Sequence, residues 1–274
     1  MMWIQGLDEA PKVVKSCYRS WVDRNPNWDV RMLDLKTCSE YFDIEKTIGN
    51  GRKDVSMAHL ADIVRINLIA DHGGVWVDAT CFCVKPLDEW IHEYCSAGFF
   101  AFLGHRRDTP ISNWLMASHL DCYLTLRIRN EVTIFWQENS FSQQRKGKTY
   151  RILKLLLNNS LYTTRFWFSP VVTRVLKVLP YFWFHYLFAE LLRKDPKFRD
   201  LWEKTPKLDA EIPHRIRKWG MLLPASAEAR KVIDEKEDLV YKLSWKLSKF
   251  DSNFDGRKFP RNCHLEYLLK SLDG

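Results

Sequence analysis

The stretch His59–Asp88, HLADIVRINLIADHGGVWVDATCFCVKPLD, decides the fold. Its first half carries apolar residues at helical spacing, and we expect this helix to begin near Asp54. Gly73 and Gly74 then supply the left-handed backbone that ends a helix. A short strand, VWVDAT, follows and places Asp78 near its end. A carboxylate at the end of a buried strand is costly unless it is paired or bound to a metal, so Asp78 requires a partner.

Composition places the chain among folded proteins of one large domain or two small ones. It has 274 residues, 46% of them hydrophobic, with 12 Trp and 16 Phe, which excludes a disordered class. The net charge of +8 indicates an anionic partner. Seven cysteines without a CxxC pair predict free thiols in a reducing compartment. The N-terminus has no apolar segment typical of a signal peptide, so we expect a cytoplasmic protein.

The order of elements predicts an α/β fold. We expect a short strand at residues 1–6, a helix within 7–26, a strand at 98–104 and a helix from 111–139. Strands alternating with helices favour layers around a mainly parallel sheet. In such sheets, ligands bind beyond the carboxyl ends of the strands, where Asp78 would lie.

The composition changes after residue 150. Residues 151–194 are rich in aromatics, and the cations Arg165, Arg174 and Lys177 interrupt every span of about 20 residues that could cross a membrane. Two interpretations fit this segment. It forms helices that pack in a core, which is the preferred interpretation, or it lies as a basic amphipathic segment on a membrane surface.

The residues of the opening stretch resemble the signature of the capsular polysaccharide synthesis proteins, relatives of the DXD sugar-binding glycosyltransferases (glycosyltransferase family 32-like). That signature has D-x-x-R on a helix, a glycine pair, and a strand ending in D-x-D. The likeness continues through WIQGLDEAPKVVKSCYRSWVDRNPNWDV, ISNWLMAS, FWFHYLFAELLRKDPKFRDLWEKTP and VYKLSWK. The resemblance implies a GT-A, Rossmann-like core in residues 1–150. It implies a helical C-terminal part, residues 151–274, that packs on the core and completes the acceptor side, so that both form one catalytic domain.

The same resemblance implies a glycosyltransferase of the hexosyltransferase type. Such an enzyme moves a sugar, with retention, from a nucleotide-diphosphate donor (UDP-sugar) to a cell-surface or capsular polysaccharide or a glycolipid. The leaving diphosphate requires positive charge, from Mn²⁺ or Mg²⁺ or from Lys and Arg. Asp78 matches the first aspartate of D-x-D and would contact the metal and the ribose. Thr80 replaces the second aspartate and is a weaker ligand, which leaves metal dependence open.

The resemblance also assigns roles to residues on the helix and at the N-terminus. Asp62 and Arg65 match D-x-x-R, and would bind the donor sugar and its diphosphate. The alternative is an i, i+3 ion pair. Trp3 would lie near the nucleobase, or else in the core. Gln5 and Gly6 follow it, and a glycine lets the backbone approach the nucleotide closely.

Further candidates lie downstream, each with a structural alternative. Asn113 would lie near the transferring carbon or the acceptor, or else cap a helix. His185 would act in catalysis or contact the acceptor, or else be a core histidine. Lys242, Ser244 and Lys246 would share one side if this segment is extended. In the family, the matching block closes over the diphosphate; the alternative is a solvated basic stretch.

The expected partners are a nucleotide-sugar donor, a polysaccharide or glycolipid acceptor and a membrane surface, with the enzyme at the inner face of the membrane. One rival interpretation is a catalytically degenerate GT-A domain that binds a glycan or a protein without transfer, because DAT stands in place of D-x-D. A nucleic-acid binder is disfavoured because the chain has no such motif and its charges are spread along the sequence.

Overall fold

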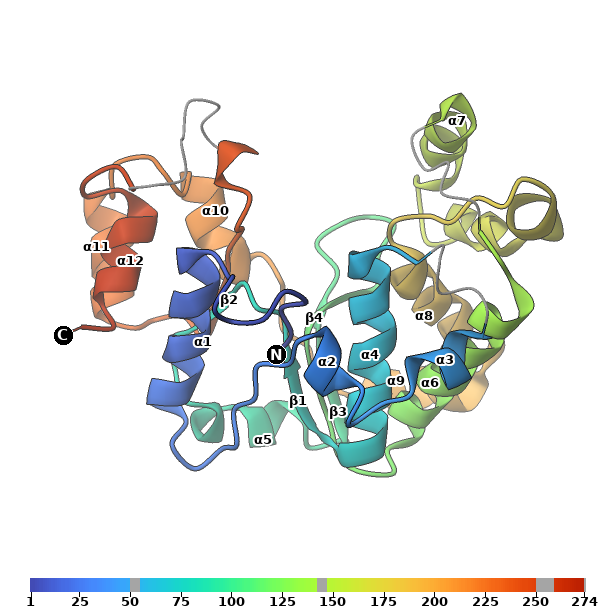
Figure 1. The fold of residues 1–274 in the computed structure, drawn as a ribbon, viewed down its shortest axis with the longest axis horizontal. Helices are drawn as coiled ribbons and strands as arrows, with labels where there is room; N and C mark the ends of the chain where they lie inside the picture. Colours follow the sequence, from blue (N-terminus) through green and yellow to red (C-terminus); the bar gives the residue numbers. More distant parts are fainter. Residues whose placement is uncertain (50–54, 142–146, 250–258, 274) are drawn as a thin grey trace. The chain divides into compact units, whose positions relative to one another are not determined.

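The computed structural model describes residues 1–49, 55–141, 147–249 and 259–273, and it forms two compact units (Figure 1). Unit 1 comprises Met1–Leu35, Val77–His92 and Ala210–Gly274, and unit 2 comprises Lys36–Trp76 and Glu93–Asp209. Each unit draws on sequence from both sides of residue 150. The domain boundary expected there stays a prediction.

Unit 1 is built around a two-stranded antiparallel sheet of β2 (Cys81–Cys83) and β5 (Val240–Lys242). Helix α1 packs against β2 through its buried face, which includes Val13, Cys17 and Trp21. The helical elements described in this unit are α1 (Lys12–Arg24), η2 (Leu87–Glu89), η5 (Ile212–His214), α10 (Arg215–Trp219), α11 (Ala227–Asp234), η6 (Leu247–Lys249) and α12 (His264–Lys270).

Unit 2 contains a three-stranded sheet in the order β1 (Gly74–Val77), β4 (Ile111–Ser118), β3 (Phe99–Leu103). The last residue of β1, Val77, begins the second segment of unit 1. Helices α4 and α8 both contact β4, the middle strand. The helical elements described here are α2 (Leu35–Cys38), α3 (Ile44–Ile48), α4 (Met57–His72), α5 (Ile91–Tyr94), α6 (Tyr123–Glu138), α7 (Lys148–Leu157), η3 (Thr163–Phe168), η4 (Val171–Val175), α8 (Trp183–Lys194) and α9 (Pro196–Lys204); α2 and α5 lie at the unit boundaries.

The helix and the glycine stop of the opening stretch are confirmed. The hydroxyl of Ser56 caps α4 by accepting a hydrogen bond from the backbone N–H of His59, while the predicted start at Asp54 lies outside the described residues. Gly73 ends α4 with φ +67°, and Gly74 has φ +83°. The strand is shorter than predicted, however. It ends at Val77, so that Asp78 begins the turn that leads to β2.

The region after β3 was predicted wrongly. Residues 111–139 do not form one helix: Ile111–Ser118 is strand β4, and helix α6 begins at Tyr123. All eight residues of β4 are buried, because the strand lies between two others and is contacted by α4 and α8. A strand covered on both faces shows no alternation of polar and apolar residues, which removes the usual sequence signal.

Two strand pairs among the described residues are antiparallel, which differs from the mainly parallel sheet expected. β3 pairs antiparallel with β4, with a register shift between Ala101 and Phe102, and β2 pairs antiparallel with β5. The predicted strand at residues 1–6 is reduced to a single parallel bridge between Met2 and Leu33.

The aromatic segment provides much of the core of unit 2. Trp183 on α8 stacks on Phe135 with ring centroids 5.6 Å apart, and meets Trp136 edge-on at 5.3 Å. The preferred core interpretation therefore holds for α8. Among the described residues, each helix is too short or too polar to span a lipid bilayer.

Candidate functional site

Asp78 has a lysine as its partner. The Lys242 ammonium lies 2.7 Å from Asp78 Oδ2 and donates a second hydrogen bond to the Thr80 hydroxyl at 2.9 Å. The lysine side chain is 14% exposed and the aspartate side chain 27%, so the group is at the surface but shielded. The three predicted residues thus form one cluster, which we call the Lys242 cluster.

Strand pairing builds this cluster. In the β2–β5 ladder, Cys81 is opposite Lys242, and the backbone N–H of Leu243 donates to the carbonyl of Thr80 at 2.8 Å. The indole N–H of Trp21 in α1 donates to the carbonyl of Cys81 at 2.8 Å. The turn that carries Asp78 is therefore held on one side by β5 and on the other by α1.

A pair of tryptophans belongs to the same unit. Trp3 meets Trp245 edge-on with centroids 5.5 Å apart, and the Lys246 ammonium lies 5.0 Å from the centre of the Trp245 ring. Trp3 also packs on a small apolar cluster that contains Ala79, the residue between Asp78 and Thr80 in the sequence. Trp245 is 45% exposed and offers an aromatic surface to solvent.

The other predicted residues of this unit have modest roles in the structure. Gln5 is exposed, and Gly6 closes a turn in which its N–H donates to the Trp3 carbonyl at 2.9 Å, with φ +84°. The Ser244 hydroxyl accepts from the backbone N–H of Lys246 at 3.2 Å. The segment after β5 is thus a compact turn, and its residues do not continue the strand.

The predicted metal ligands do not fit a divalent cation in this arrangement. Mn²⁺ and Mg²⁺ take about six oxygen ligands and prefer carboxylates. Here Asp78 supplies the one carboxylate, Thr80 is neutral, and the ammonium of Lys242 is bonded to both. Across the described ranges, no three His, Cys, Asp or Glu side chains are grouped as a metal site.

Cys17 is close enough to Lys242 for electrostatic interaction, but it is fully buried in α1. Burial raises the pKa of its thiol well above the ordinary value, with a smaller contribution in the same direction from Cys81. The thiol therefore stays protonated and is not a nucleophile.

A second cluster of predicted residues lies in unit 2. Asp62 Oδ1 accepts a hydrogen bond from Asn113 Nδ2 at 2.8 Å and lies 3.3 Å from a guanidinium nitrogen of Arg65. Arg65 also donates to the backbone carbonyl of Asn113, and stacks over the ring of Trp76 at 5.4 Å. The Asp62, Arg65 and Asn113 side chains are nearly fully buried. The ion pair considered as the alternative reading is therefore present.

The helix N-cap that was considered as the structural alternative for Asn113 is wrong. Asn113 lies inside β4, where its amide faces α4 and bonds to Asp62. A buried carboxylate and a buried guanidinium require neighbouring hydrogen-bond partners, and the β4 backbone and amide supply them.

His185 lies on α8. Its ring meets Phe182 at 5.3 Å and Phe184 at 6.3 Å, both edge-on. Its expected part in catalysis or acceptor contact stays a prediction.

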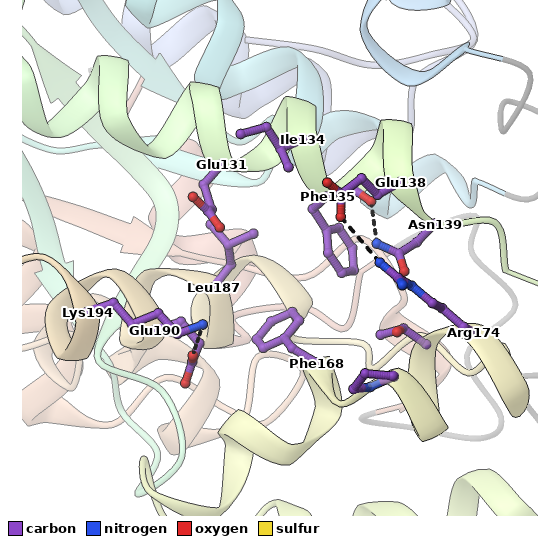
Figure 2. Close-up of a pocket in the computed structure, with 12 residues that line it drawn as sticks. Glu131, Ile134, Phe135, Glu138, Asn139, Phe168, Arg174, Leu187, Glu190 and Lys194 are labelled. Atoms are coloured by element: carbon purple, nitrogen blue, oxygen red, sulfur yellow. Dashed lines mark hydrogen bonds and ion pairs between the residues drawn. The ribbon is translucent and has the colours of Figure 1, made fainter.

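Unit 2 also has a pocket of about 230 Å³ that contains none of the predicted site residues (Figure 2). Phe135 and Phe168 form its apolar part. Its charged side chains are paired, with Glu138 3.6 Å from Arg174 and Glu190 2.9 Å from Lys194.

Sequence reasoning missed Trp245, which lies between the two predicted residues Ser244 and Lys246. The local signal was weak: a tryptophan between polar residues can be exposed, and an exposed ring can stack on a nucleobase. The pairing with Trp3 could not be seen, because the two residues are 242 positions apart in the sequence.

The comparison with protein families is decisive for classification. The family model described as capsular polysaccharide synthesis protein matches residues 1–255. The chain belongs to this family. The match includes both clusters of predicted residues and all of the segments on which the resemblance rests.

One curated relative is an O-glycosyltransferase, braB, from Annulohypoxylon truncatum. It is 27% identical over 145 residues, which cover 41% of this chain and 34% of the relative. The chain thus spans about a third of the length of that relative. No solved structure matches the chain.

Proposed function

We propose that this protein is a glycosyltransferase of the hexosyltransferase type with a GT-A-like fold. It would transfer a sugar, with retention, from UDP-sugar to a capsular or cell-surface polysaccharide or a glycolipid at the inner face of the membrane. The family match and the name of the relative support the reaction class. The observation that carries the proposal is the Lys242 cluster, a shielded cation at the position where the family signature ends.

In this proposal, Lys242 stabilises the leaving nucleoside diphosphate. As the bond between the sugar and the diphosphate breaks, negative charge grows on the diphosphate oxygen, and a cation already in place lowers the free energy of that state. Asp78 and Thr80 hold the ammonium in one orientation through two hydrogen bonds. The Lys242 side chain is thus already ordered before the sugar donor binds, so donor binding does not incur the entropy cost of ordering it.

Lys246, Trp3 and Trp245 would bind the other parts of the nucleotide. An aromatic ring stacks on any nucleobase and contributes about 1–3 kcal/mol per base. The Trp245 ring is exposed and lies beside Trp3, which makes it the better stacking surface of the two. The Lys246 ammonium at the edge of this ring would attract the diphosphate.

The leaving diphosphate was expected to need positive charge from Mn²⁺ or Mg²⁺ or from Lys and Arg, and the proposal assigns this role to Lys242. This assignment is supported by the hydrogen bonds of Asp78 and Thr80. These two predicted metal ligands both accept from the Lys242 ammonium. Hydrolysis of UDP-sugar is therefore expected to continue in excess EDTA. A rate that falls to background in EDTA and returns with Mn²⁺ would restore the metal site and overturn this assignment.

The experiment that tests the function is a donor-hydrolysis screen with UDP-, GDP- and CDP-sugars, followed by variants. Lys242→Met should lower kcat with the best donor by about 10²–10³-fold, the usual effect of removing one group that stabilises developing charge. The matched control is Lys218→Met, an exposed lysine of the same unit that pairs with Glu211. Its activity should equal that of the unmodified protein, and equal rates for both variants would contradict the role of Lys242.

The catalytically degenerate domain is kept as a second candidate because Thr80 replaces an acidic ligand of the family signature. A titration with UDP, followed by tryptophan fluorescence, separates the candidates when it is combined with the hydrolysis screen. Binding of UDP that Asp78→Ala abolishes, together with turnover of a donor, supports the transferase. Binding without turnover of any donor supports the degenerate domain.

A further inference from the structure

Helix α7 has two apolar faces, and the core covers one of them. Tyr150, Leu153 and Leu157 pack against a buried cluster that includes Trp167 and Tyr186. The opposite face carries three exposed apolar residues, Ile152 at 57%, Leu155 at 76% and Leu156 at 59%. A helix that meets water on its outer side normally carries polar residues there.

Exposed apolar side chains continue beyond α7 into η3, which contacts α7, and into η4, which contacts η3. Ten of the seventeen exposed large apolar side chains in the described part of the chain lie within residues 152–181. In η3, η4 and the residues beside them, the exposed side chains are Leu161, Tyr162, Phe166, Val171, Val175 and Leu176. Figure 1 shows α7 at the edge of unit 2, away from its sheet. We call residues 148–181 the basic apolar surface.

The charge of this surface has one sign. The sequence from residue 139 to 189 contains no Asp or Glu, and the basic apolar surface carries six cations: Lys148, Arg151, Lys154, Arg165, Arg174 and Lys177. Within the described residues, the one acidic partner of these cations is Glu138 on α6, which lies 3.6 Å from Arg174. The remaining cations are available to an anionic partner.

The positions of the cations relative to the apolar side chains are also informative. On α7, Arg151 and Lys154 lie on the flank of the helix, between the packed face and the exposed apolar face. Arg165 lies over the rings of Tyr162 and Phe166, at 3.8 and 4.7 Å from their centres. Long basic side chains beside exposed apolar and aromatic groups are the arrangement of segments that lie in the plane of a membrane interface.

We propose that the basic apolar surface binds an anionic lipid bilayer, with α7 lying in the interface. Exposed apolar side chains that gather along one segment mark interaction sites more often than isolated ones do. A bilayer removes the apolar side chains from water, and its anionic headgroups meet the cations. This inference does not depend on the proposed reaction, because it rests on residues outside both clusters of the candidate site.

The test is flotation of the purified protein with vesicles, without any sugar donor. The protein should bind vesicles of phosphatidylcholine that contain about 30% phosphatidylglycerol. Its affinity for vesicles of phosphatidylcholine alone should be at least tenfold lower. The charge variant Lys148→Gln/Arg151→Gln/Lys154→Gln should weaken binding by on the order of 100-fold, about fivefold per cation. The apolar variant Ile152→Ser/Leu155→Ser/Leu156→Ser should abolish the binding that remains at high salt.

The matched control is Leu120→Ser, because Leu120 is 58% exposed in the same unit but lies outside the basic apolar surface. It should bind vesicles as the unmodified protein does. Absence of binding by the unmodified protein, or binding that the apolar variant leaves unchanged, would overturn the proposal. So would a concentration-dependent dimer in size-exclusion chromatography that the apolar variant dissociates, since the surface would then join two copies of the chain. None of these results would affect donor hydrolysis.

Discussion

Asp62 and Arg65 form the ion pair that the structural interpretation expected, while their role in donor binding stays a prediction. Their charges are almost completely removed from water, at 8% and 4% exposure. The pair is tolerable because Asn113 completes the hydrogen bonding of both side chains, through its amide and its carbonyl. A donor that bound Asp62 would therefore meet a carboxylate already held in place.

The first prediction concerns this pair. Asp62→Ala should lower the free energy of unfolding by about 3 kcal/mol, because it leaves the buried Arg65 charge without its acidic partner. Urea denaturation followed by circular dichroism measures the change. The control is Asp71→Ala, which lies on the same helix and breaks an exposed pair with Arg129. It should cost less than about 1 kcal/mol, and equal costs for the two variants would contradict the importance of burial.

At the scale of residues, the sequence predicted that Asp78 needs a partner but did not identify it as Lys242. The need follows from local information, a carboxylate beside a buried strand. The partner lies 164 positions later and is brought close by the pairing of β2 with β5, which no periodicity reveals. The sequence identified Lys242 and Thr80 separately as candidate site residues. The hydrogen bond between them is known only from the structure.

At the scale of elements, the two glycines after α4 are needed for different reasons. Both have positive φ, at +67° and +83°, but only Gly73 also lies close to neighbouring backbone atoms. A Cβ on Gly73 would lie 3.1 Å from the backbone nitrogen of Leu120 and 3.3 Å from the carbonyl oxygen of Ser118. A Cβ on Gly74 would have no heavy atom within 4 Å.

The second prediction follows from this difference. Gly74→Ala should destabilise the protein by about 1 kcal/mol, the cost of left-handed backbone for a residue with a side chain. Gly73→Ala should cost more than Gly74→Ala, because backbone atoms near β4 must also shift. Thermal unfolding of the two variants side by side measures both. A smaller loss for Gly73→Ala would show that the contacts near Leu120 are easily relieved.

The start of α9 is held by Asp195, whose carboxylate accepts from the backbone N–H of Phe198 at 3.0 Å. It also accepts from the Tyr123 hydroxyl and from Arg127, both on α6. The backbone hydrogen bond is the main cause that lowers the pKa of Asp195 below its ordinary value of 3.8, and the Tyr123 and Arg127 hydrogen bonds act in the same direction.

The third prediction uses this lowered pKa. Because the folded state favours the charged carboxylate, its contribution to stability is complete above the unfolded value of 3.8 and is lost as the pH falls through the lower folded value. Asp195→Ala should therefore cost about 1–2 kcal/mol at pH 7, and the difference from the unmodified protein should shrink below pH 3.8. Urea midpoints at several pH values test it. If the stability difference between Asp195→Ala and the unmodified protein did not change with pH, the charge of Asp195 would be excluded as its cause.

The elements that the sequence predicted best have a clear pattern of apolar residues and end at a glycine. Helix α4 ends at its glycine pair, and β3 matches the apolar run between Gly98 and Gly104. β4 was missed because its burial on both faces erases the period of two, and its sequence continues directly into the amphipathic helix α6. Tertiary burial, and not the local preference of these residues, determines that they form a strand.

At the scale of the whole molecule, the reactivity of the seven cysteine thiols reports whether the core of each unit is closed to solvent. All seven are free, and all except Cys122 are buried. Burial raises the pKa of Cys83 to about 12 and that of Cys95 to about 11. At neutral pH these thiols are protonated as well as inaccessible, so the reactive thiolate form is scarce in the folded protein.

The last prediction is that a thiol reagent such as Ellman's reagent titrates one cysteine, Cys122, in the native protein at pH 7.5 and all seven in concentrated urea. Four buried thiols belong to unit 1 (Cys17, Cys81, Cys83 and Cys263), and two, Cys38 and Cys95, belong to unit 2. The number of thiols that react at each urea concentration therefore reports which core has opened. Cys122→Ser should remove the native signal without changing the number released by urea. Rapid reaction of more than one thiol in the native protein would show that at least one of the two cores is open to solvent.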